Sequence, residues 1–218
     1  MPIDVVEAAG PADLPDDFAS AEIDLILIDA TLPEAEKTAL IARARAAPKQ
    51  PFIILMAGVG GTITEEADAV VAKPRNVDEA QKLAERCMRV RLPSRVLVVD
   101  DSSMMRKIVG KTISATRFPV EIVEAEEGEV AIARVHEGDV DIVFLDYNMP
   151  GLDGLETLQR LKKAQPSLEI IFMTSVADQA VEARAHRGGA AAFLKKPFYP
   201  ADVEAVLRGY YGLLKPAQ

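Results

Sequence analysis

The stretch Val140-Asp-Ile-Val-Phe-Leu-Asp-Tyr-Asn-Met-Pro150 decides the fold of this 218-residue chain. A run of β-branched and apolar residues leads to Asp146 and is followed by the turn-forming residues Pro150 and Gly151. This pattern predicts a buried parallel strand that carries a carboxylate at its C-terminal end. Ligands of open α/β sheets bind at that edge of the sheet, so Asp146 is the first candidate site residue.

Three other apolar runs lead to polar side chains that suit the same site. One run ends in the adjacent pair Asp100 and Asp101, another ends in Thr174, and a third leads to Lys196. Because the carboxyl ends of parallel strands lie along one edge of a sheet, we expect these side chains to converge with Asp146.

Residues 94–218 alternate between predicted strands and helices. Five strand–helix units with short connections predict an α/β fold with a doubly wound parallel sheet, in the flavodoxin-like (βα)5 arrangement. The strands are expected at 95–100, 120–125, 140–146, 169–174 and 191–195, and the helices from about 103, near 128–137, 154–164 and 178–187, and from about 200.

An internal repeat extends this fold to the first part of the chain. Ile23–Pro33 aligns without a gap with Val140–Pro150, so that Asp29 takes the place of Asp146. Residues 52–57 and 69–74 then match 169–174 and 192–197 in the same order. We therefore expect two tandem domains, residues 1–91 and 94–218, of which the first lacks one βα unit.

A predicted amphipathic helix closes the first domain. The apolar residues Ala80, Leu83, Ala84, Cys87 and Met88 follow helical spacing, which predicts that they share one buried helix face.

The first domain is incomplete at its N-terminal end. Only a strand candidate at 3–7 and a short helical stretch at 13–19 precede the strand at 23–29. In a sheet of strand order 2-1-3-4-5 the missing first strand is central, so its loss would leave unpaired backbone groups. Either the N-terminal segment fills the central position and gives a four-stranded sheet, or a partner chain supplies a strand. We favour the first alternative.

Composition and charge limit the function classes. The formal net charge is −9 and we find no basic patch, which argues against nucleic acid as a direct partner. The chain has neither an uncharged apolar run of about 18 residues nor an N-terminal signal segment, so no membrane association is indicated. The single cysteine, Cys87, fits a reducing cytoplasm, and we expect a cytoplasmic protein.

The three aspartates predict a metal site. Two carboxylates about 4 Å apart repel each other by about 4 kcal/mol at an effective dielectric constant near 20, and a divalent cation removes this conflict. A few oxygen ligands at an open edge favour Mg²⁺. The expected ligands are the carboxylates of Asp101 and Asp146 and the backbone carbonyl of Asn148, with Asp100 bound directly or through water.

The same residues predict phosphoryl transfer to a carboxylate. An aspartate such as Asp146 can act as a nucleophile toward a phosphoryl group, and the cation and the Lys196 ammonium would neutralise the developing charge. The Thr174 hydroxyl is placed to bind a phosphoryl oxygen. Its inward movement would vacate space into which Phe193 turns, which would change the surface of the last strand and helix.

On the basis of the acid pair, Asp146, Thr174 and Lys196, residues 94–214 resemble a response-regulator receiver domain of bacterial two-component signalling. The opening Val99–Val109 is similar to that of CheY-like chemotaxis receivers. The resemblance implies that Asp146 is the phosphoacceptor, with Asp100 and Asp101 as the acidic metal pair. It also implies that Thr174 and Lys196 are catalytic or switch residues, and that Phe193 is the rotating aromatic residue where chemotaxis receivers commonly have Tyr.

The first domain resembles a receiver whose chemistry has been removed. Asp29 and Lys73 remain, but Ala57 stands at the place of Thr174 and no acid pair precedes Asp29. We expect this domain to serve interaction or dimerisation rather than phosphorylation.

The resemblance implies a response regulator without an output domain that is not an enzyme, apart from slow self-dephosphorylation. A sensor histidine kinase or a histidine phosphotransfer protein would phosphorylate Asp146, and the switched face would bind an unknown target protein. One alternative is an aspartyl-phosphate phosphatase, although such enzymes usually carry a second acid where Asn148 stands here. The other alternative is a scaffold in which neither domain is phosphorylated.

Overall fold

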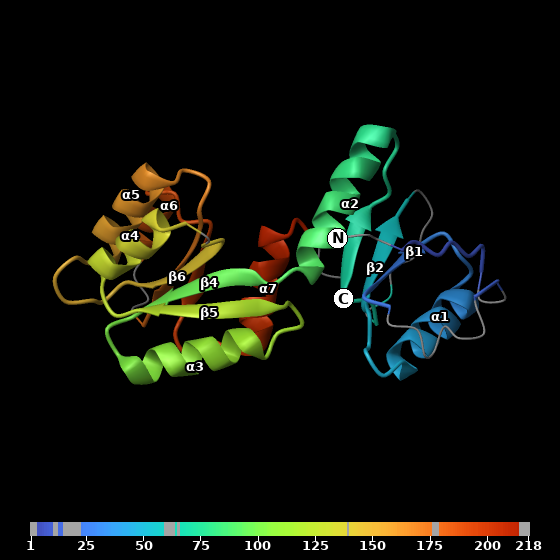
Figure 1. The fold of residues 1–218 in the computed structure, drawn as a ribbon, viewed down its shortest axis with the longest axis horizontal. Helices are drawn as coiled ribbons and strands as arrows, with labels where there is room; N and C mark the ends of the chain where they lie inside the picture. The colour runs from blue at the N-terminus through green and yellow to red at the C-terminus, as the bar shows by residue number, and fades with distance from the viewer. Residues whose placement is uncertain are drawn as a thin grey trace. The chain divides into compact units, whose positions relative to one another are not determined.

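The chain was described from a computed structural model that defines residues 4–10, 13–14, 23–58, 64, 66–138, 140–175 and 179–213. The described residues form two compact units, each with its own sheet (Figure 1). One unit contains the residues up to Cys87 together with Gly212 and Leu213, and the other is Met88–Tyr211. The domain boundary expected at residues 91–94 stays a prediction.

The second unit contains a five-stranded parallel sheet of order β5-β4-β6-β7-β8. This order is that of the predicted doubly wound fold, and the α/β fold class is confirmed. The strands are β4 (Ser94–Val99), β5 (Val120–Ala125), β6 (Ile142–Asp146), β7 (Glu169–Thr174) and β8 (Ala192–Lys195), and the helices are α3 (Ser103–Ser114), α4 (Gly128–His136), α5 (Gly154–Ala164), α6 (Gln179–Arg187) and α7 (Pro200–Tyr210).

The helices of the second unit cover both faces of its sheet. Helices α4, α5 and α6 lie on one face, and α3 lies on the other with α7 (Figure 1). Two helix starts are capped by side chains: Ser102 accepts a hydrogen bond from the Met105 N–H at 3.3 Å, and Asp153 accepts one from the Glu156 N–H at 2.8 Å. These caps fix where each helix begins after its strand.

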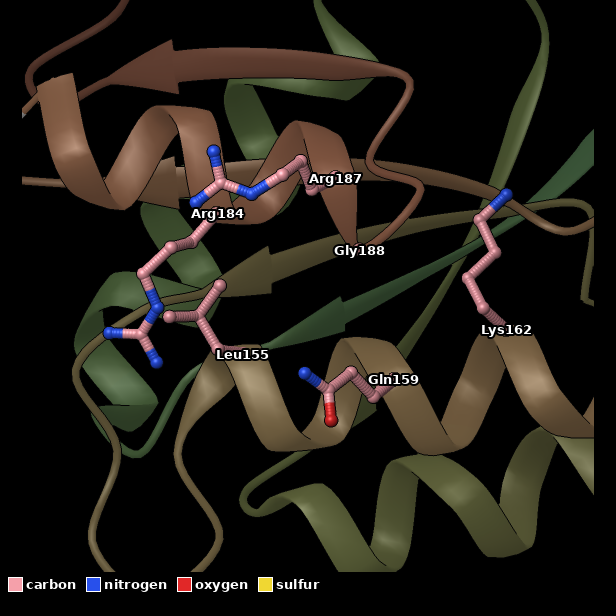
Figure 2. Close-up of a pocket in the computed structure, with 6 residues that line it drawn as sticks. All are labelled: Leu155, Gln159, Lys162, Arg184, Arg187 and Gly188. Carbon is pink, nitrogen blue, oxygen red and sulfur yellow. The ribbon is translucent and has the colours of Figure 1, made fainter.

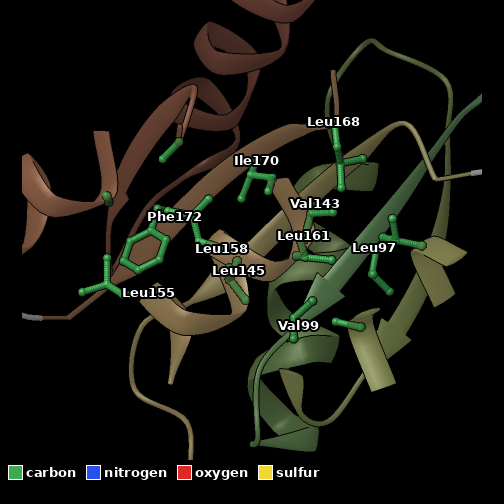
Figure 3. Close-up of a cluster of buried hydrophobic side chains, with 14 of the residues drawn as sticks. Leu97, Val99, Val143, Leu145, Leu155, Leu158, Leu161, Leu168, Ile170 and Phe172 are labelled. Atoms are coloured by element: carbon green, nitrogen blue, oxygen red, sulfur yellow. The ribbon is translucent and has the colours of Figure 1, made fainter. Parts of the chain in front are cut away.

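The main core lies between the sheet and helices α4, α5 and α6. Strand β6 is buried along its whole length, which is why its sequence is an uninterrupted apolar run. Figure 3 shows side chains of the sheet facing those of α5 and of the segment that leads into β7. They include Leu97, Val99, Val143, Leu145, Leu158, Leu161, Leu168 and Phe172. This packing holds the carboxyl ends of the strands in register.

The first unit contains a three-stranded parallel sheet of order β1-β2-β3. Its elements are β1 (Leu25–Asp29), α1 (Glu34–Ala46), β2 (Phe52–Ala57), β3 (Ala69–Ala72) and α2 (Val77–Arg91). Its small core lies around Ile28, Ile41 and Leu55.

The strands of the two sheets pair in the same register when the two copies of the internal repeat are aligned. In the first unit Asp29 lies beside Met56, and in the second unit Asp146 lies beside Met173. The next pair of strands repeats this match, because Ala57 lies beside Ala72 as Thr174 lies beside Lys195. Strands β1, β2 and β3 therefore correspond residue by residue to β6, β7 and β8.

The favoured prediction for the N-terminal segment is wrong. The described residues 4–10 form no strand, and the first sheet has three strands rather than four. The segment is too polar to compete for the central position, since Val5 and Val6 are followed by Glu7 and two alanines and both valines remain exposed. Ile3 and most of the helical stretch expected at 13–19 lie outside the described residues.

Helix α2 is present as predicted, but its buried face is narrower than expected. Leu83 and Cys87 are buried, whereas Ala80, Ala84 and Met88 are exposed. The buried stripe of α2 therefore follows Leu83, Cys87 and Val90. Within the described part of the chain, no helix has the length and apolar character needed to cross a lipid bilayer.

Candidate functional site

Three strand ends of the second unit bring their predicted side chains together. Asp100 directly follows β4, Asp146 ends β6, and Lys196 directly follows β8. The Lys196 Nζ donates hydrogen bonds to Asp100 Oδ2 at 2.6 Å and to Asp146 Oδ1 at 2.7 Å. Of the strand ends expected to converge, those of Asp100, Asp146 and Lys196 are therefore brought together.

Asp101 completes an acidic cluster at this edge. One carboxylate oxygen each from Asp100, Asp101 and Asp146 lies within 4.8 Å of the others, and Asp101 is exposed while the other two are buried. Three oxygen ligands, one of them open to solvent, suit a hard divalent cation that retains some of its water. The donor set thus fits Mg²⁺. The role of the Asn148 carbonyl as a further ligand stays a prediction.

Backbone groups fix the orientation of the two buried carboxylates. Asp100 Oδ1 accepts a hydrogen bond from the Ser102 N–H at 3.0 Å, and Asp146 Oδ2 accepts one from the Asn148 N–H at 3.0 Å. In each case the donor is the backbone N–H two residues after the aspartate, in the turn that follows the strand. One oxygen of each carboxylate is thereby held toward the backbone and the other toward Lys196.

Burial and neighbouring charges shift the pKa values of Asp146 and Lys196. Burial raises the pKa of Asp146, and the Asp100 carboxylate adds to this rise, although the Lys196 ammonium opposes it. Burial also disfavours the charged form of Lys196, but its hydrogen bonds to Asp100 and Asp146 outweigh this effect and raise its pKa. Lys196 therefore stays protonated, and one ammonium faces more than one carboxylate.

Thr174 and Phe193 lie at the expected positions in the fold. Thr174 is the last residue of β7 and is fully buried, and its carbonyl accepts a hydrogen bond from the Lys196 N–H at 2.7 Å. Phe193 lies on β8 and stacks on Phe172 with 6.0 Å between ring centroids. The switch roles of these two residues stay predictions.

Two residues that support the site were not predicted. The Arg106 guanidinium donates to the Asp100 carbonyl at 2.8 Å and pairs with Glu124 at 2.8 Å, which ties the end of β4 to β5. Gly154 packs so closely on the Asp146 carbonyl that an added Cβ would lie 2.3 Å from its oxygen. Residue spacing gives no signal for either contact, because both depend on distances between separate elements.

The first unit repeats part of this geometry without the acidic cluster. Lys73 pairs with Asp29 as Lys196 pairs with Asp146, and the Thr31 N–H donates to Asp29 at 3.0 Å as the Asn148 N–H donates to Asp146. The hydrogen bond from Lys73, together with those from Thr31, lowers the pKa of Asp29 to about 2. Among the described residues no second acid joins Asp29 in a metal-binding group.

Comparison with known proteins identifies the second unit. The family model for the response regulator receiver domain matches residues 96–208. Chemotaxis protein CheY of Thermotoga maritima is 34% identical over 113 residues, which is 52% of this chain and 93% of the relative. Chemotaxis protein CheY of Listeria monocytogenes is 36% identical over 104 residues, which is 48% of this chain and 87% of the relative.

Solved structures agree with this result. A chain of the CheX–CheY–BeF3–Mg²⁺ complex from Borrelia burgdorferi has a TM-score of 0.51 and 26% identity, and the match covers 56% of this chain and 91% of that one. The receiver domain of NtrX from Brucella abortus has a TM-score of 0.50 and 29% identity, with 54% of this chain and 98% of that chain covered. From its sequence, its fold and its acidic site, the chain belongs to the response regulator receiver domain family of two-component signalling.

Proposed function

We propose that Asp146 accepts a phosphoryl group from the phosphohistidine of a sensor kinase or of a histidine phosphotransfer protein. A carboxylate oxygen of Asp146 forms the new bond to phosphorus, the bond from phosphorus to the imidazole nitrogen breaks, and the imidazole takes up a proton. The observation that carries the proposal is the Lys196 ammonium, which lies 2.6 and 2.7 Å from the two buried carboxylates at one sheet edge.

The other site residues have distinct tasks in this proposal. Asp100, Asp101 and Asp146, with the Asn148 carbonyl, would hold Mg²⁺, which neutralises phosphoryl oxygens when bound. Lys196 balances the charge of the acyl phosphate from the opposite side. Thr174 donates its hydroxyl to a phosphoryl oxygen, and Phe193 on the adjacent strand transmits that movement to the surface of β8 and α7, where a target protein binds.

Labelling with a small phosphodonor tests this function. Incubation of the full chain with acetyl phosphate and Mg²⁺ is expected to give a phosphoprotein. Its phosphoryl label should be lost in alkali, because acyl phosphates hydrolyse at high pH. Mass spectrometry should locate the label at Asp146. The same incubation with excess EDTA should give no label, whereas labelling that persists in EDTA would contradict a cation-dependent site.

The alternative of a phosphatase for external substrates is disfavoured by Asn148. An aspartyl-phosphate phosphatase needs a general acid near the nucleophile, and the amide of Asn148 cannot supply a proton in that way. We therefore propose a phosphoprotein with slow self-dephosphorylation that acts in the cytoplasm through protein contacts. The scaffold alternative is disfavoured by the acidic cluster, because three clustered carboxylates repel one another and the single ammonium of Lys196 does not balance their charge.

We further propose that the first unit is a degenerate receiver that is not phosphorylated. The shared register of the two sheets and the matching lysine–aspartate pairs support this assignment. Ala57 has no hydroxyl at the place of Thr174, and Asp29 is neutralised by Lys73 rather than grouped with acids. This unit is left with an interaction role.

Strand β1 has an open edge suited to that role. The Asp24 carbonyl accepts from the Phe52 N–H and the Ala30 N–H donates to Met56, both at 3.0 Å, so alternate backbone groups face β2 and those of Leu25 and Leu27 face away. Among the described residues no strand pairs with this edge, although the corresponding edge of β6 is paired with β4. Leu27 is 42% exposed.

A second copy of the chain fits this edge. Antiparallel pairing of two β1 strands about Leu27 would place Leu27 against its copy and Asp29 opposite Leu25, so no two acidic residues would face each other. The pair would join two three-stranded sheets into one continuous sheet and satisfy the open backbone groups. We therefore propose a homodimer formed through β1.

The substitution Leu27→Lys tests the dimer. Light scattering or sedimentation across the micromolar range is expected to show a dimer for the wild type and a monomer for the variant, because each edge would carry a lysine that faces its copy. Val77→Lys changes a more exposed apolar residue of the same unit and should leave the dimer intact. A wild type that stays monomeric would contradict the dimer without affecting the phosphorylation of Asp146.

A further inference from the structure

A cavity of about 490 Å³ opens between helices α5 and α6 of the second unit, and none of the candidate site residues lines it. Its lining consists of Leu155, Gln159 and Lys162 from α5, Arg184 and Arg187 from α6, and Gly188, which follows α6 (Figure 2). This volume falls within the usual range for small-molecule sites.

The charge around this cavity is opposite to that of the whole chain. Helices α5 and α6 together carry five Lys or Arg residues and two Glu residues, although the chain has a net charge of −9. Glu156 already has a partner on its own helix, since it pairs with Arg160 at 2.6 Å, and Glu182 lies 3.9 Å from the His186 ring. Among the described residues no acidic side chain lines the cavity, so the described lining carries positive charge only.

Two guanidinium groups carry this positive charge. Arg184 and Arg187 are three residues apart on α6, which places them on one helix face, and Figure 2 shows that both side chains end on the Leu155 side of the cavity. Within the described part of the chain neither guanidinium has a hydrogen bond or ion pair. In Figure 2 the Gln159 side chain runs along α5, with its amide on the side of Leu155.

The Lys162 ammonium, in contrast to the two guanidinium groups, is bound to backbone carbonyls. Its Nζ donates to the carbonyls of Leu168 at 2.8 Å and Pro166 at 3.3 Å, and Figure 2 shows the ammonium turned away from the guanidinium groups. It therefore forms one end of the cavity and leaves the two arginines as the available cations.

The shape of the cavity depends on a close contact between the helices. A Cβ on Gly188 would lie 2.8 Å from Leu158 Cδ2, so a larger residue there would push the end of α6 away from α5. Leu155 is buried and gives the cavity an apolar wall. A free inorganic anion would fill only a small part of this volume.

We propose that this cavity binds a small organic phosphate, with the phosphate held by Arg184 and Arg187 and the organic part against Leu155 and Gln159. Guanidinium groups bind phosphate oxygens in pairs of charge-assisted hydrogen bonds, which suits two free arginines on one face. A long polyanion would meet the acidic remainder of the chain, whereas a compact ligand senses only the field within about 8–10 Å. The ligand class is therefore a phosphorylated metabolite rather than nucleic acid.

Titration of the full chain with glucose 6-phosphate and with AMP tests this site, with glucose and adenosine as uncharged counterparts. Excess EDTA removes divalent cations, so that phosphate cannot bind through a cation at Asp100, Asp101 and Asp146. Calorimetry is expected to show binding of at least one phosphate and of neither counterpart, and the tighter phosphate distinguishes a sugar from a nucleoside source. The backbone NMR signals of Gln159 and Gly188 should shift on binding.

Matched variants locate the binding. Arg184→Gln combined with Arg187→Gln should weaken binding of the phosphate at least tenfold, whereas Lys163→Gln on α5, outside the cavity lining, should leave it unchanged. All three side chains are exposed, so thermal unfolding of the variants should match that of the wild type.

Three results would overturn the proposal. The first is equal binding by the wild type and the double variant, and the second is equal binding of phosphates and their uncharged counterparts. The third is binding of inorganic phosphate as tightly as of either organic phosphate, which would remove the role of the apolar wall.

Discussion

Replacement of Asp146 by Asn is expected to reduce labelling by acetyl phosphate and Mg²⁺ by at least about a hundredfold, because the amide has no nucleophilic carboxylate oxygen. Asp29→Asn makes the same chemical change at the corresponding position of the first unit and should leave labelling at the wild-type level. The measurement is the initial rate of formation of the alkali-labile phosphoprotein.

The folded state of the Asp146→Asn protein is expected to survive the change. Burial raises the pKa of Asp146, so its ionised form is less favourable in the folded state than in the unfolded chain, and this cost is present above the raised pKa. The neutral amide avoids that cost, and Lys196 keeps Asp100 as a partner. Label that survives in a folded Asp146→Asn protein would refute the acceptor assignment, as would loss of label in Asp29→Asn.

Gly154→Ala is expected to lower the free energy of unfolding by about 3 kcal/mol, at the upper end of the usual cost of overpacking. The added methyl would lie 2.3 Å from the Asp146 carbonyl oxygen and 2.8 Å from the Tyr147 Cα. Both are backbone atoms next to a fully buried strand, so they cannot move aside by a rotamer change. Urea unfolding measured by circular dichroism gives the difference.

Gly209→Ala in helix α7 is the matched control. A Cβ at Gly209 would meet no atom within 4 Å, so alanine should stabilise the helix by up to about 1 kcal/mol through its better helix propensity. The two substitutions are chemically identical and should therefore act in opposite directions. Equal stability of Gly154→Ala and the wild type would show that β6 and α5 do not approach as closely as described.

The second unit could be predicted from the sequence almost element by element. Strands β6 and β7 contain continuous apolar runs because both faces of the sheet are covered there, and such runs end where the sheet edge meets solvent. The polar residues at those ends therefore marked the site directly, and Asp100, Asp146 and Lys196 lie within hydrogen-bonding reach in the structure.

The first unit was harder to predict because the predictions that proved wrong there depend on tertiary packing rather than on local sequence pattern. The alternation Ile3–Glu7 has the local pattern of a strand, but a strand needs a place in a sheet, and no periodicity reveals whether that place is filled. The spacing of Ala80 to Met88 likewise predicts the helix correctly, but Ala80 and Met88 are exposed, because which helix positions are buried depends on tertiary packing. The close approach at Gly154 and the Arg106 contacts depend on distances that residue spacing does not encode.

Strand β4 performs two tasks in the second unit, since it pairs with the inner edge of β6 and delivers the acidic pair Asp100 and Asp101 to the site. A receiver without that strand loses both functions together. If the first unit is such a receiver, as proposed, the loss of this strand removes its chemistry and also leaves the edge of β1 free to pair with another strand. In the proposed homodimer, the first units would hold two phosphorylatable second units in one assembly.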